Sequence, residues 1–396
     1  MLLRLLLLRR KNGFWIGVVF VALLIISVRN GVFNRQDGFV LDSTSSLSLI
    51  PPPTTSLPKS EDLFQSFFVW TKEELRARPA AEHSPTKGST VQCKTEKKGP
   101  DFVVECPFPK RTNRARMFDF FLYNGEQTML EMRLATLDSV VDYFIVVEGE
   151  ETFSGRKKPA FFRELIVSRN YSFPLDKFAK RFIYVSVPTL VTNQPFDREA
   201  LARATLLKRL EELGIGEDDI LILADIDEIP RPEVVDYVAS HAFVSNAMIR
   251  IEVFFSYFTF FWENKQLPWE IRMIKAGFVA NARDPSIIHH ARRSTKVDVN
   301  FSGKGGWHCS FCLSLDEVVR KVMAYSHVEH ANPTFLEQSR LKHKIENGLD
   351  PFDRNIKYTK VCPDDLPYFY SRHPERAARP EFSHLVSDRS MCGLAS

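Results

Sequence analysis

The chain has 396 residues, of which 44% are hydrophobic, enough for one large domain with tethering segments or for two modest domains. Its formal net charge is +4, but residues 1–40 hold six basic residues and one acidic residue and alone carry +5. The rest of the chain therefore sums to −1, which excludes a broad basic surface for nucleic acid.

The N-terminal segment predicts a membrane anchor. Residues 14–28 are uncharged and almost wholly apolar, and a helix of roughly 15–18 residues spans about 23–27 Å, which suits a thin early-secretory bilayer. Three basic residues at positions 9–11 precede it, so the positive-inside rule places the N-terminus in the cytosol and the rest in the lumen. We expect a single-pass type II protein of the Golgi membrane, with a cleaved signal peptide as the alternative.

A segment rich in serine, threonine and proline follows. Residues 42–60 show neither a helical nor a strand period and can bury little apolar surface. The expected organisation is a cytosolic tail, a transmembrane signal anchor, a stem or linker, a catalytic domain and a C-terminal tail, over residues 1–11, 12–29, 30–112, 113–380 and 381–396.

Cysteines and glycosylation sequons fit a lumenal protein. The even number of cysteines predicts disulfides, with the pairing left open (Cys93, Cys106, Cys309, Cys312, Cys362 and Cys392). Cys309 and Cys312 form a C-x-x-C pair, for which a redox or zinc role is the alternative. Sequons predict N-glycosylation at Asn170 and Asn300.

Strands alternate with helices from residue 116 onward. Apolar runs predict strands at residues 117–123, 143–147, 182–187 and 220–224. Leucines at helical spacing predict a helix around residues 130–137. The alternation predicts an α/β fold with a mostly parallel central sheet covered on both faces, and ligands then bind at the carboxyl ends of the strands.

Two further helices have recognisable ends. Asp197 is a suitable N-cap for a helix that Gly214 stops, and Pro232 opens the next one.

An acidic motif follows the fourth predicted strand. Asp225, Asp227 and Glu228 would repel one another unless a positive group neutralised them. Two carboxylates in Asp-x-Asp can reach one divalent cation, whose other positions are filled by diphosphate oxygens and water. The cation then stabilises a departing nucleotide diphosphate. We expect a metal at Asp225 and Asp227, with a solvated acidic loop as the alternative.

A glycine-rich segment precedes a Trp-His pair. Three glycines at positions 303, 305 and 306 allow a backbone to approach a ligand closely. Trp307 then offers an aromatic face to a donor substrate, and His308 offers a third metal ligand. A structural histidine is the alternative for His308.

Charged residues on the predicted elements are candidates for contacts with a donor nucleotide or sugar. They are Glu131, Arg133, Glu148 and Arg203. The alternatives are a structural ion pair for Glu131 with Arg133, and a solvated helix face for Arg203.

Four segments resemble glycosyltransferase family 17. They are residues 126–162, 218–230, 305–312 and, more weakly, 344–353. The resemblance implies a GT-A-like nucleotide-sugar-binding domain, UDP-GlcNAc as donor, Mn²⁺ as the ion, and inverting β-1,4 transfer of N-acetylglucosamine to a β-mannose of an N-glycan core.

The resemblance also assigns individual positions. Asp225 and Asp227 match the acidic motif of the family, and Trp307 and His308 match its Trp-His pair. Thr128 stands where the first motif of the family has an aspartate, and the chain after residue 355 resembles the family poorly.

An inverting transfer needs a general base to deprotonate the acceptor hydroxyl. The candidates are Asp353, which matches a family motif position, together with Glu270, Asp298 and Glu263. Three alternative functions remain: a membrane-tethered glycan-binding protein without turnover, a glycosyltransferase with another acceptor, and a metal-dependent hydrolase.

Overall fold

The computed structural model describes residues 90–99, 101–171, 173–189, 192, 194–243, 247–280, 287–363 and 365–387. The expected cytosolic tail, the anchor and most of the stem lie outside these residues, and so does Cys392. Within the described part of the chain, no helix is long and apolar enough to cross a membrane.

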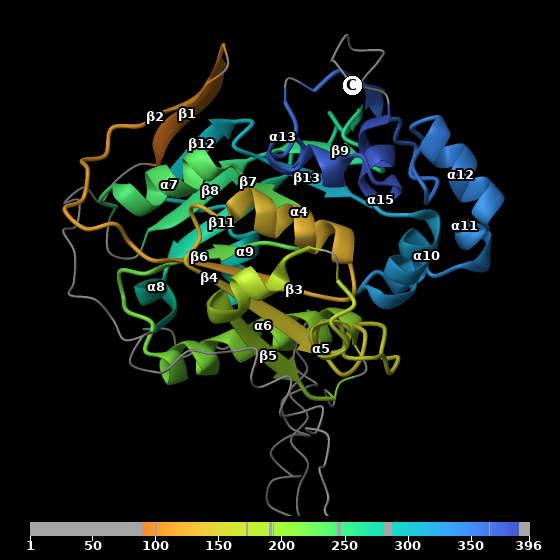
Figure 1. Cartoon of the computed structure of the whole chain (residues 1–396), viewed down its shortest axis with the longest axis horizontal. Helices are drawn as coiled ribbons and strands as arrows, with labels where there is room; N and C mark the ends of the chain where they lie inside the picture. The colour runs from red at the N-terminus through yellow and green to blue at the C-terminus, as the bar shows by residue number, and fades with distance from the viewer. Residues whose placement is uncertain are drawn as a thin grey trace, which may run out of the picture. The chain divides into compact units, whose positions relative to one another are not determined.

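A nine-stranded sheet runs through the centre of the described residues (Figure 1). In spatial order its strands are β2 (Asp101–Glu105), β1 (Val91–Lys98), β12 (Val299–Gly303), β8 (Met248–Glu252), β11 (Glu270–Lys275), β6 (Ile220–Leu223), β3 (Met117–Leu122), β4 (Tyr143–Gly149) and β5 (Phe182–Val187). Strands β2 and β11 run antiparallel to the other seven. The predicted mostly parallel sheet is confirmed, and the four apolar runs form β3, β4, β5 and β6.

The central strands are apolar at nearly every position because both faces of the sheet are covered. In β3, Met117 and Phe121 belong to one apolar core, while Phe118 and Phe120 belong to the other. Asp119 is the polar exception in this strand and is fully buried.

Helices cover the two faces (Figure 1). One core includes α4 (Gln127–Leu137), α5 (Phe161–Ser168) and α7 (Pro232–Ser240), and the other includes α6 (Pro195–Leu213), α8 (Ala276–Ala280) and α9 (Ile287–Arg293). The predicted helices are therefore confirmed. The start of α6 differs from the prediction: the helix begins at Pro195, whose missing N–H is tolerated at a first position, and Asp197 lies in the first turn.

A smaller sheet and a helical C-terminal part complete the described chain. The sheet has the order β14 (Thr359–Lys360), β10 (Trp262–Glu263), β9 (Phe254–Tyr257), β13 (Gly306–Ser310) and β7 (Glu228–Pro230). The helical segments are η1 (Leu175–Arg181), α10 (Leu315–Ala324), η2 (Val328–His330), α11 (Pro333–Leu336), α12 (Gln338–Glu346), α13 (Phe369–Arg372), α14 (Pro374–Ala377) and α15 (Pro380–Ser383). Because β13 pairs with β7, it lies next to the turn that carries the acidic motif.

The folded part extends beyond both expected boundaries, at residues 113 and 380. Strand β1 pairs in parallel with β12, so residues assigned to the stem are part of the large sheet. At the other end, Phe382 and Leu385 are buried although they were assigned to the C-terminal tail. Neither segment carried a periodic apolar pattern long enough to be recognised.

Disulfides are confirmed. Cys93 bonds to Cys106, which links β1 to the residue after β2, and Cys309 bonds to Cys312 just after β13. Cys362 is disulfide-bonded as well. The C-x-x-C sulfurs form a buried bond to each other, so the structure does not offer them as zinc ligands.

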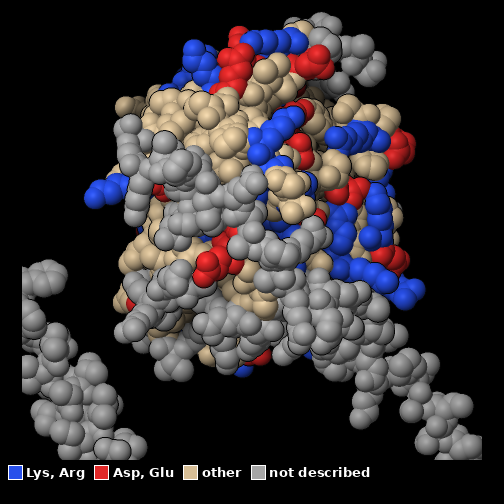
Figure 2. Space-filling view, turned by 90° about the vertical axis from the view of Figure 1, so that its left-hand side faces the viewer, with Lys and Arg blue, Asp and Glu red and all other residues tan. Residues whose placement is uncertain are grey.

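Surface charge is mixed. On the face shown in Figure 2, lysine and arginine side chains lie beside aspartate and glutamate side chains. This agrees with a chain that is close to neutral after residue 40.

Candidate active site

A pocket of about 730 Å³ opens where the carboxyl ends of β3, β4 and β6 meet. Its walls include the turn after β6, the side of α6, the loop before β11, and residues of β13, α10 and η2. Ligand sites in open parallel sheets form at this edge, where the strand order reverses. Here the chain moves from β3 outward to β5 and then returns to β6 on the other side of β3.

A buried arginine shapes the acidic turn. Arg133 of α4 forms two hydrogen bonds to Asp119 of β3, at 2.7 and 2.5 Å, and neither residue has exposed side-chain surface. Its other terminal nitrogen donates to the carbonyls of Asp225, at 2.9 Å, and Glu228, at 2.7 Å. The guanidinium therefore joins β3, α4 and the turn after β6.

This differs from two predictions. Arg133 and Glu131 were expected at the donor substrate or paired with each other, but Arg133 pairs with Asp119 and Glu131 pairs with Arg376 at 2.5 Å. Neither is among the residues that line the pocket. Thr128, at the position of the family aspartate, is also buried in α4 and outside the pocket lining.

Three cationic side chains hold the carboxylates of the acidic motif. Asp225 accepts from Arg203 of α6 at 2.7 Å and from Arg292 of α9 at 2.5 Å. Asp227 accepts from Lys321 of α10 at 2.7 Å. Since Arg203 is almost fully buried and bonded to Asp225, the solvated-face alternative for this residue is wrong.

Glu228 is fully buried and orders the same turn. One carboxylate oxygen accepts the backbone N–H of Asp225 at 2.7 Å, and the other accepts the indole N–H of Trp269 at 2.6 Å. Arg292 donates to both oxygens at 2.7 Å. Glu228 therefore positions its neighbours and has no exposed surface for a ligand.

The charges of the cluster do not balance. Ion pairs also link Glu126 to Lys321, at 3.8 Å, and Glu199 to Arg203, at 3.1 Å. Among the described residues, the linked set then holds five carboxylates and three cations, a net charge of −2. A divalent cation would neutralise this charge.

The protonation states suit metal binding. Burial disfavours the ionised form of both carboxylates, but Arg292 and Arg203 hold the pKa of Asp225 below its ordinary value, and Lys321 does the same for Asp227. Burial lowers the pKa of His308 and keeps its imidazole neutral at pH 7. Ionised carboxylates and a neutral imidazole are the forms that bind metals.

The geometry fits a cation between Asp227 and His308. Oδ1 of Asp227 lies 3.9 Å from Nε2 of His308, and two ligand atoms, each about 2.1 Å from one ion, lie about 3–4 Å apart. The His308 ring is held by stacking on Phe255, with centroids 4.4 Å apart and planes 2° apart. Its Nδ1 is buried and has no hydrogen-bond partner in the described part of the chain.

A second cluster of potential ligands lies at the rim of the pocket. Among the described residues, only His327, Glu329 and His330 place three ligand atoms within 4.8 Å of one another. The two imidazole rings are nearly parallel, at 24°, with centroids 5.6 Å apart. Nδ1 of His327 is hydrogen-bonded to Glu329 at 2.8 Å and Nδ1 of His330 to the hydroxyl of Tyr325 at 2.6 Å, and we do not assign a metal there.

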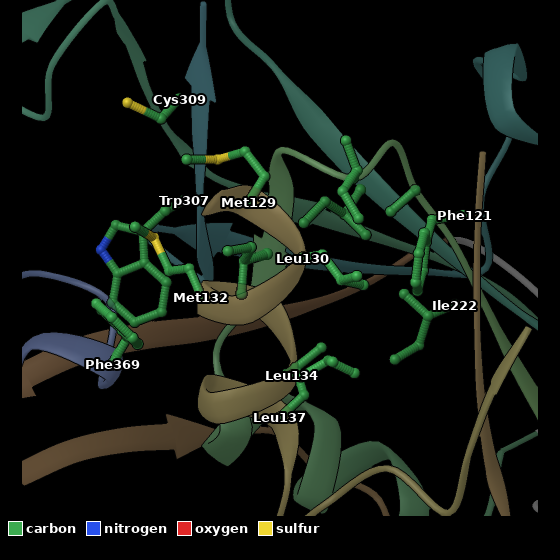
Figure 3. Packing of buried hydrophobic residues seen from close by; sticks show 14 of the residues in the cluster. Phe121, Met129, Leu130, Met132, Leu134, Leu137, Ile222, Trp307, Cys309 and Phe369 are labelled. Atoms are coloured by element: carbon green, nitrogen blue, oxygen red, sulfur yellow. The ribbon is translucent and has the colours of Figure 1, made fainter. Parts of the chain in front are cut away.

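Trp307 faces away from the pocket. Successive side chains of a strand point to opposite faces, so when His308 points into the pocket its neighbour enters the core. Trp307 is 1% exposed, lies 4.2 Å from the Arg231 guanidinium, and packs beside Met132 and Phe369 (Figure 3). The predicted contact with a donor substrate is therefore wrong.

The glycines before the Trp-His pair serve packing. A Cβ on Gly305 would lie 2.6 Å from Ile251, and one on Gly306 would lie 2.7 Å from the carbonyl of Ile229. These contacts let β13 approach β7 and β8 closely, and the glycines are not part of the pocket lining.

Glu148 also has a structural role. Its carboxylate accepts the backbone N–H of Phe162, at the start of α5, at 3.0 Å and the hydroxyl of Tyr184 at 3.0 Å. Lys158, which lines the pocket, is 3.5 Å away. Glu148 therefore does not line the pocket itself, where we expected it to contact a ligand, but contacts the lining residue Lys158.

Of the general-base candidates, only Glu270 lines the pocket. Asp298 precedes β12 and accepts the backbone N–H of Met248, at the opposite ends of these strands. Asp353 pairs with Arg340 and Lys344 of α12. Asp298 and Asp353 therefore lie outside the pocket lining, and so does Glu263 of β10.

The two sequons differ in exposure. Asn170 is exposed just after α5. Asn300 is 4% exposed within β12, and its side-chain nitrogen donates to Gln92 at 2.9 Å and Glu252 at 3.1 Å. A glycan on this nitrogen cannot be accommodated in the sheet, so the prediction for Asn300 is wrong.

Sequence reasoning missed Arg292, Lys321 and Trp269. Arg292 and Lys321 lie 67 and 94 residues beyond the aspartates that they contact. The capping box of Ser314 and Glu317 is a signal for the start of α10, but it does not say where Lys321 points.

The family model of glycosyltransferase family 17 matches residues 95–358, about two thirds of the chain. The matched stretch contains the acidic motif, the Trp-His pair, Arg292 and Lys321. No curated protein matches the chain.

Proposed function

The chain belongs to glycosyltransferase family 17 and is a glycosyltransferase, and from this premise we propose that it transfers N-acetylglucosamine from UDP-GlcNAc to a β-mannose of an N-glycan core. The proposed linkage is β-1,4, and the reaction inverts the anomeric carbon. The mostly parallel sheet with its pocket at the carboxyl edge supports a GT-A-like arrangement.

The observation that carries the proposal is the acidic turn at the base of the pocket. Asp227 and His308 would hold a divalent cation, Mn²⁺ in our expectation, with Asp225 as the second carboxylate of the motif. The net charge of −2 and the separation of 3.9 Å between Asp227 and His308 support this assignment. Such an ion supplies positive charge to the departing diphosphate.

The basic side chains of the pocket bind the same group. Arg203 has two guanidinium nitrogens, Nε and Nη1, that are buried and without a partner among the described residues. Together with Arg292 and Lys321 it would orient the diphosphate of UDP-GlcNAc and share the charge that develops on it.

Glu270 is the proposed general base. In the transfer, the acceptor oxygen forms a bond to the anomeric carbon while the bond from that carbon to the phosphate oxygen breaks, and UDP leaves with the electron pair. Glu270 takes the proton of the acceptor hydroxyl. Its side chain is 38% exposed, lines the pocket and is oriented by Arg272.

We also propose that the protein is a type II Golgi membrane protein with a lumenal catalytic domain. The apolar segment with basic residues before it supports the anchor. The disulfides within the catalytic domain support an oxidising compartment.

One experiment separates the candidate functions. The full-length protein in detergent is incubated with UDP-GlcNAc, Mn²⁺ and a biantennary N-glycan. A glycan that gains one N-acetylhexosamine, with release of UDP, supports transfer, and the Asp227→Ala variant should give neither product. A glycan trimmed to chitobiose lacks the β-mannose and should not react.

The other outcomes contradict the proposal in different ways. Release of UDP without a gain on the glycan indicates a hydrolase or a different acceptor. Glycan binding without either product indicates a binding protein without turnover.

A further inference from the structure

The loop before β11 exposes apolar side chains to the pocket. Leu267 is 43% exposed and Trp269 is 37% exposed, and both line the pocket. Within the described residues only five large hydrophobic side chains are exposed. Three of these five line the pocket: Leu267, Trp269 and Phe196. Two neighbouring apolar residues left open to a pocket indicate a ligand that covers them.

The loop is ordered by its own hydrogen bonds. Asn264 is 5% exposed, and its side-chain oxygen accepts the backbone N–H groups of Gln266 and Leu267 at 3.1 and 3.2 Å. The carbonyl of Trp269 accepts the backbone N–H of Val253 at 3.2 Å. The apolar surface is therefore presented on a defined backbone.

The indole of Trp269 is anchored at one edge. Its N–H donates to Glu228 at 2.6 Å, and its ring lies 4.9 Å from the ring of His308 and 5.3 Å from that of Phe255. The exposed part of the ring system is consequently held beside the proposed metal ligands.

The position in the sheet separates this loop from the donor side. Strand β11 pairs with β6 on the side opposite β3 and β4. Of the cations that suit a diphosphate, Arg203 lies on α6, and this helix packs against β4 and β5, on the other side of β6 from β11. A ligand on Trp269 would therefore meet the donor across the acidic turn.

We propose that Leu267 and Trp269 form the platform for the acceptor sugar. A pyranose ring has a face of C–H groups that stacks on an aromatic ring, and hydroxyls at its edge that bind carboxylates. Glu270 follows directly in the chain and lines the same pocket, so a sugar on the indole has its hydroxyls next to the proposed base. This inference rests on the proposed transfer reaction and names the site of its acceptor.

The test measures glycan binding and donor binding separately, with full-length protein. Biantennary N-glycan, free and as a glycopeptide, and UDP-GlcNAc with Mn²⁺ are titrated by calorimetry into four variants. Trp269→Leu should weaken binding of both glycan forms about tenfold, and Leu267→Ser by a smaller factor. Trp269→Phe loses the bond to Glu228 but keeps a ring, so it should bind glycan better than Trp269→Leu. Leu201→Ser, at an exposed leucine of α6 outside the pocket lining, is the matched control and should behave as the unaltered protein.

Several results overturn the platform. Weaker UDP-GlcNAc binding with unchanged glycan affinity in Trp269→Leu would place the donor on the indole. Equal glycan affinities in Trp269→Phe and Trp269→Leu would show that the ring face is not used. No glycan binding by the unaltered protein overturns it as well, even where UDP-GlcNAc binds. Glycan binding that depends on Trp269, without donor binding or turnover, would instead support the platform and overturn the transferase.

Discussion

Replacement of Arg133 tests how the fold shapes the site. The Arg133→Met variant keeps most of the side-chain volume but removes the guanidinium. It leaves Asp119 as an unpaired carboxylate in the core, and it removes the donor to the carbonyls of Asp225 and Glu228.

The size of the effect follows from the burial of both partners. Removing one member of a buried ion pair costs about 3–5 kcal/mol, because the remaining charge has no partner. Replacing the pair together, in Asp119→Leu with Arg133→Met, removes that charge and should recover most of the lost stability. The carbonyls of the acidic turn still lack their donor in the double variant, so activity should stay low.

The assay compares unfolding by urea with transfer from UDP-GlcNAc for the two single variants and the double variant. If the double variant recovers stability but not activity, the result supports the role of the Arg133 guanidinium in positioning the acidic turn. An ordinary substitution changes the free energy of unfolding by about 1 kcal/mol. If Arg133→Met lowers it by no more than this, Arg133 and Asp119 do not form the buried ion pair that the structure shows. Full activity in the double variant would show that the turn does not need this donor.

Three further predictions concern the metal and the topology. Asp227→Ala should abolish transfer and leave the melting temperature of metal-free protein within a few degrees; normal activity in this variant would remove the proposed metal site. His308→Ala should raise the Mn²⁺ concentration that gives half-maximal activity, whereas an unchanged requirement with a stability loss of about 1–3 kcal/mol would identify a structural histidine. In cells, Asn170→Gln should increase electrophoretic mobility because a glycan is lost, and Asn300→Gln should leave mobility unchanged. A lumenal location would be contradicted if Asn170 carries no glycan and protease added to intact microsomes digests the domain.

The sequence alone determined the elements around the acidic motif. Four apolar runs predicted β3 to β6 because a strand buried on both faces must be apolar along its length. The placement of Asp225 directly after such a run then put it at the carboxyl edge of a parallel sheet. His308 was recognised for its residue type next to an unusual glycine pattern.

The roles of individual side chains depended on contacts between distant parts of the chain. Glu148 and Asp225 both follow apolar runs, yet Glu148 turns toward the start of α5 and Asp225 toward α6 and α9. Trp307 and His308 are neighbours, yet strand alternation sends one into the core and the other into the pocket. No local pattern states which of the two faces is the core.

Only the tertiary structure selected among the carboxylates proposed as the base. In the sequence each of Glu270, Asp298 and Asp353 is an acid in a segment of mixed polarity, and only Asp353 matches a motif position of the family. The antiparallel course of β11 brings its first residue, Glu270, to the carboxyl edge of the parallel strands, while the parallel course of β12 leaves Asp298 at the opposite end. Strand direction is set by pairing across the sheet, and it therefore cannot be read from either segment by itself.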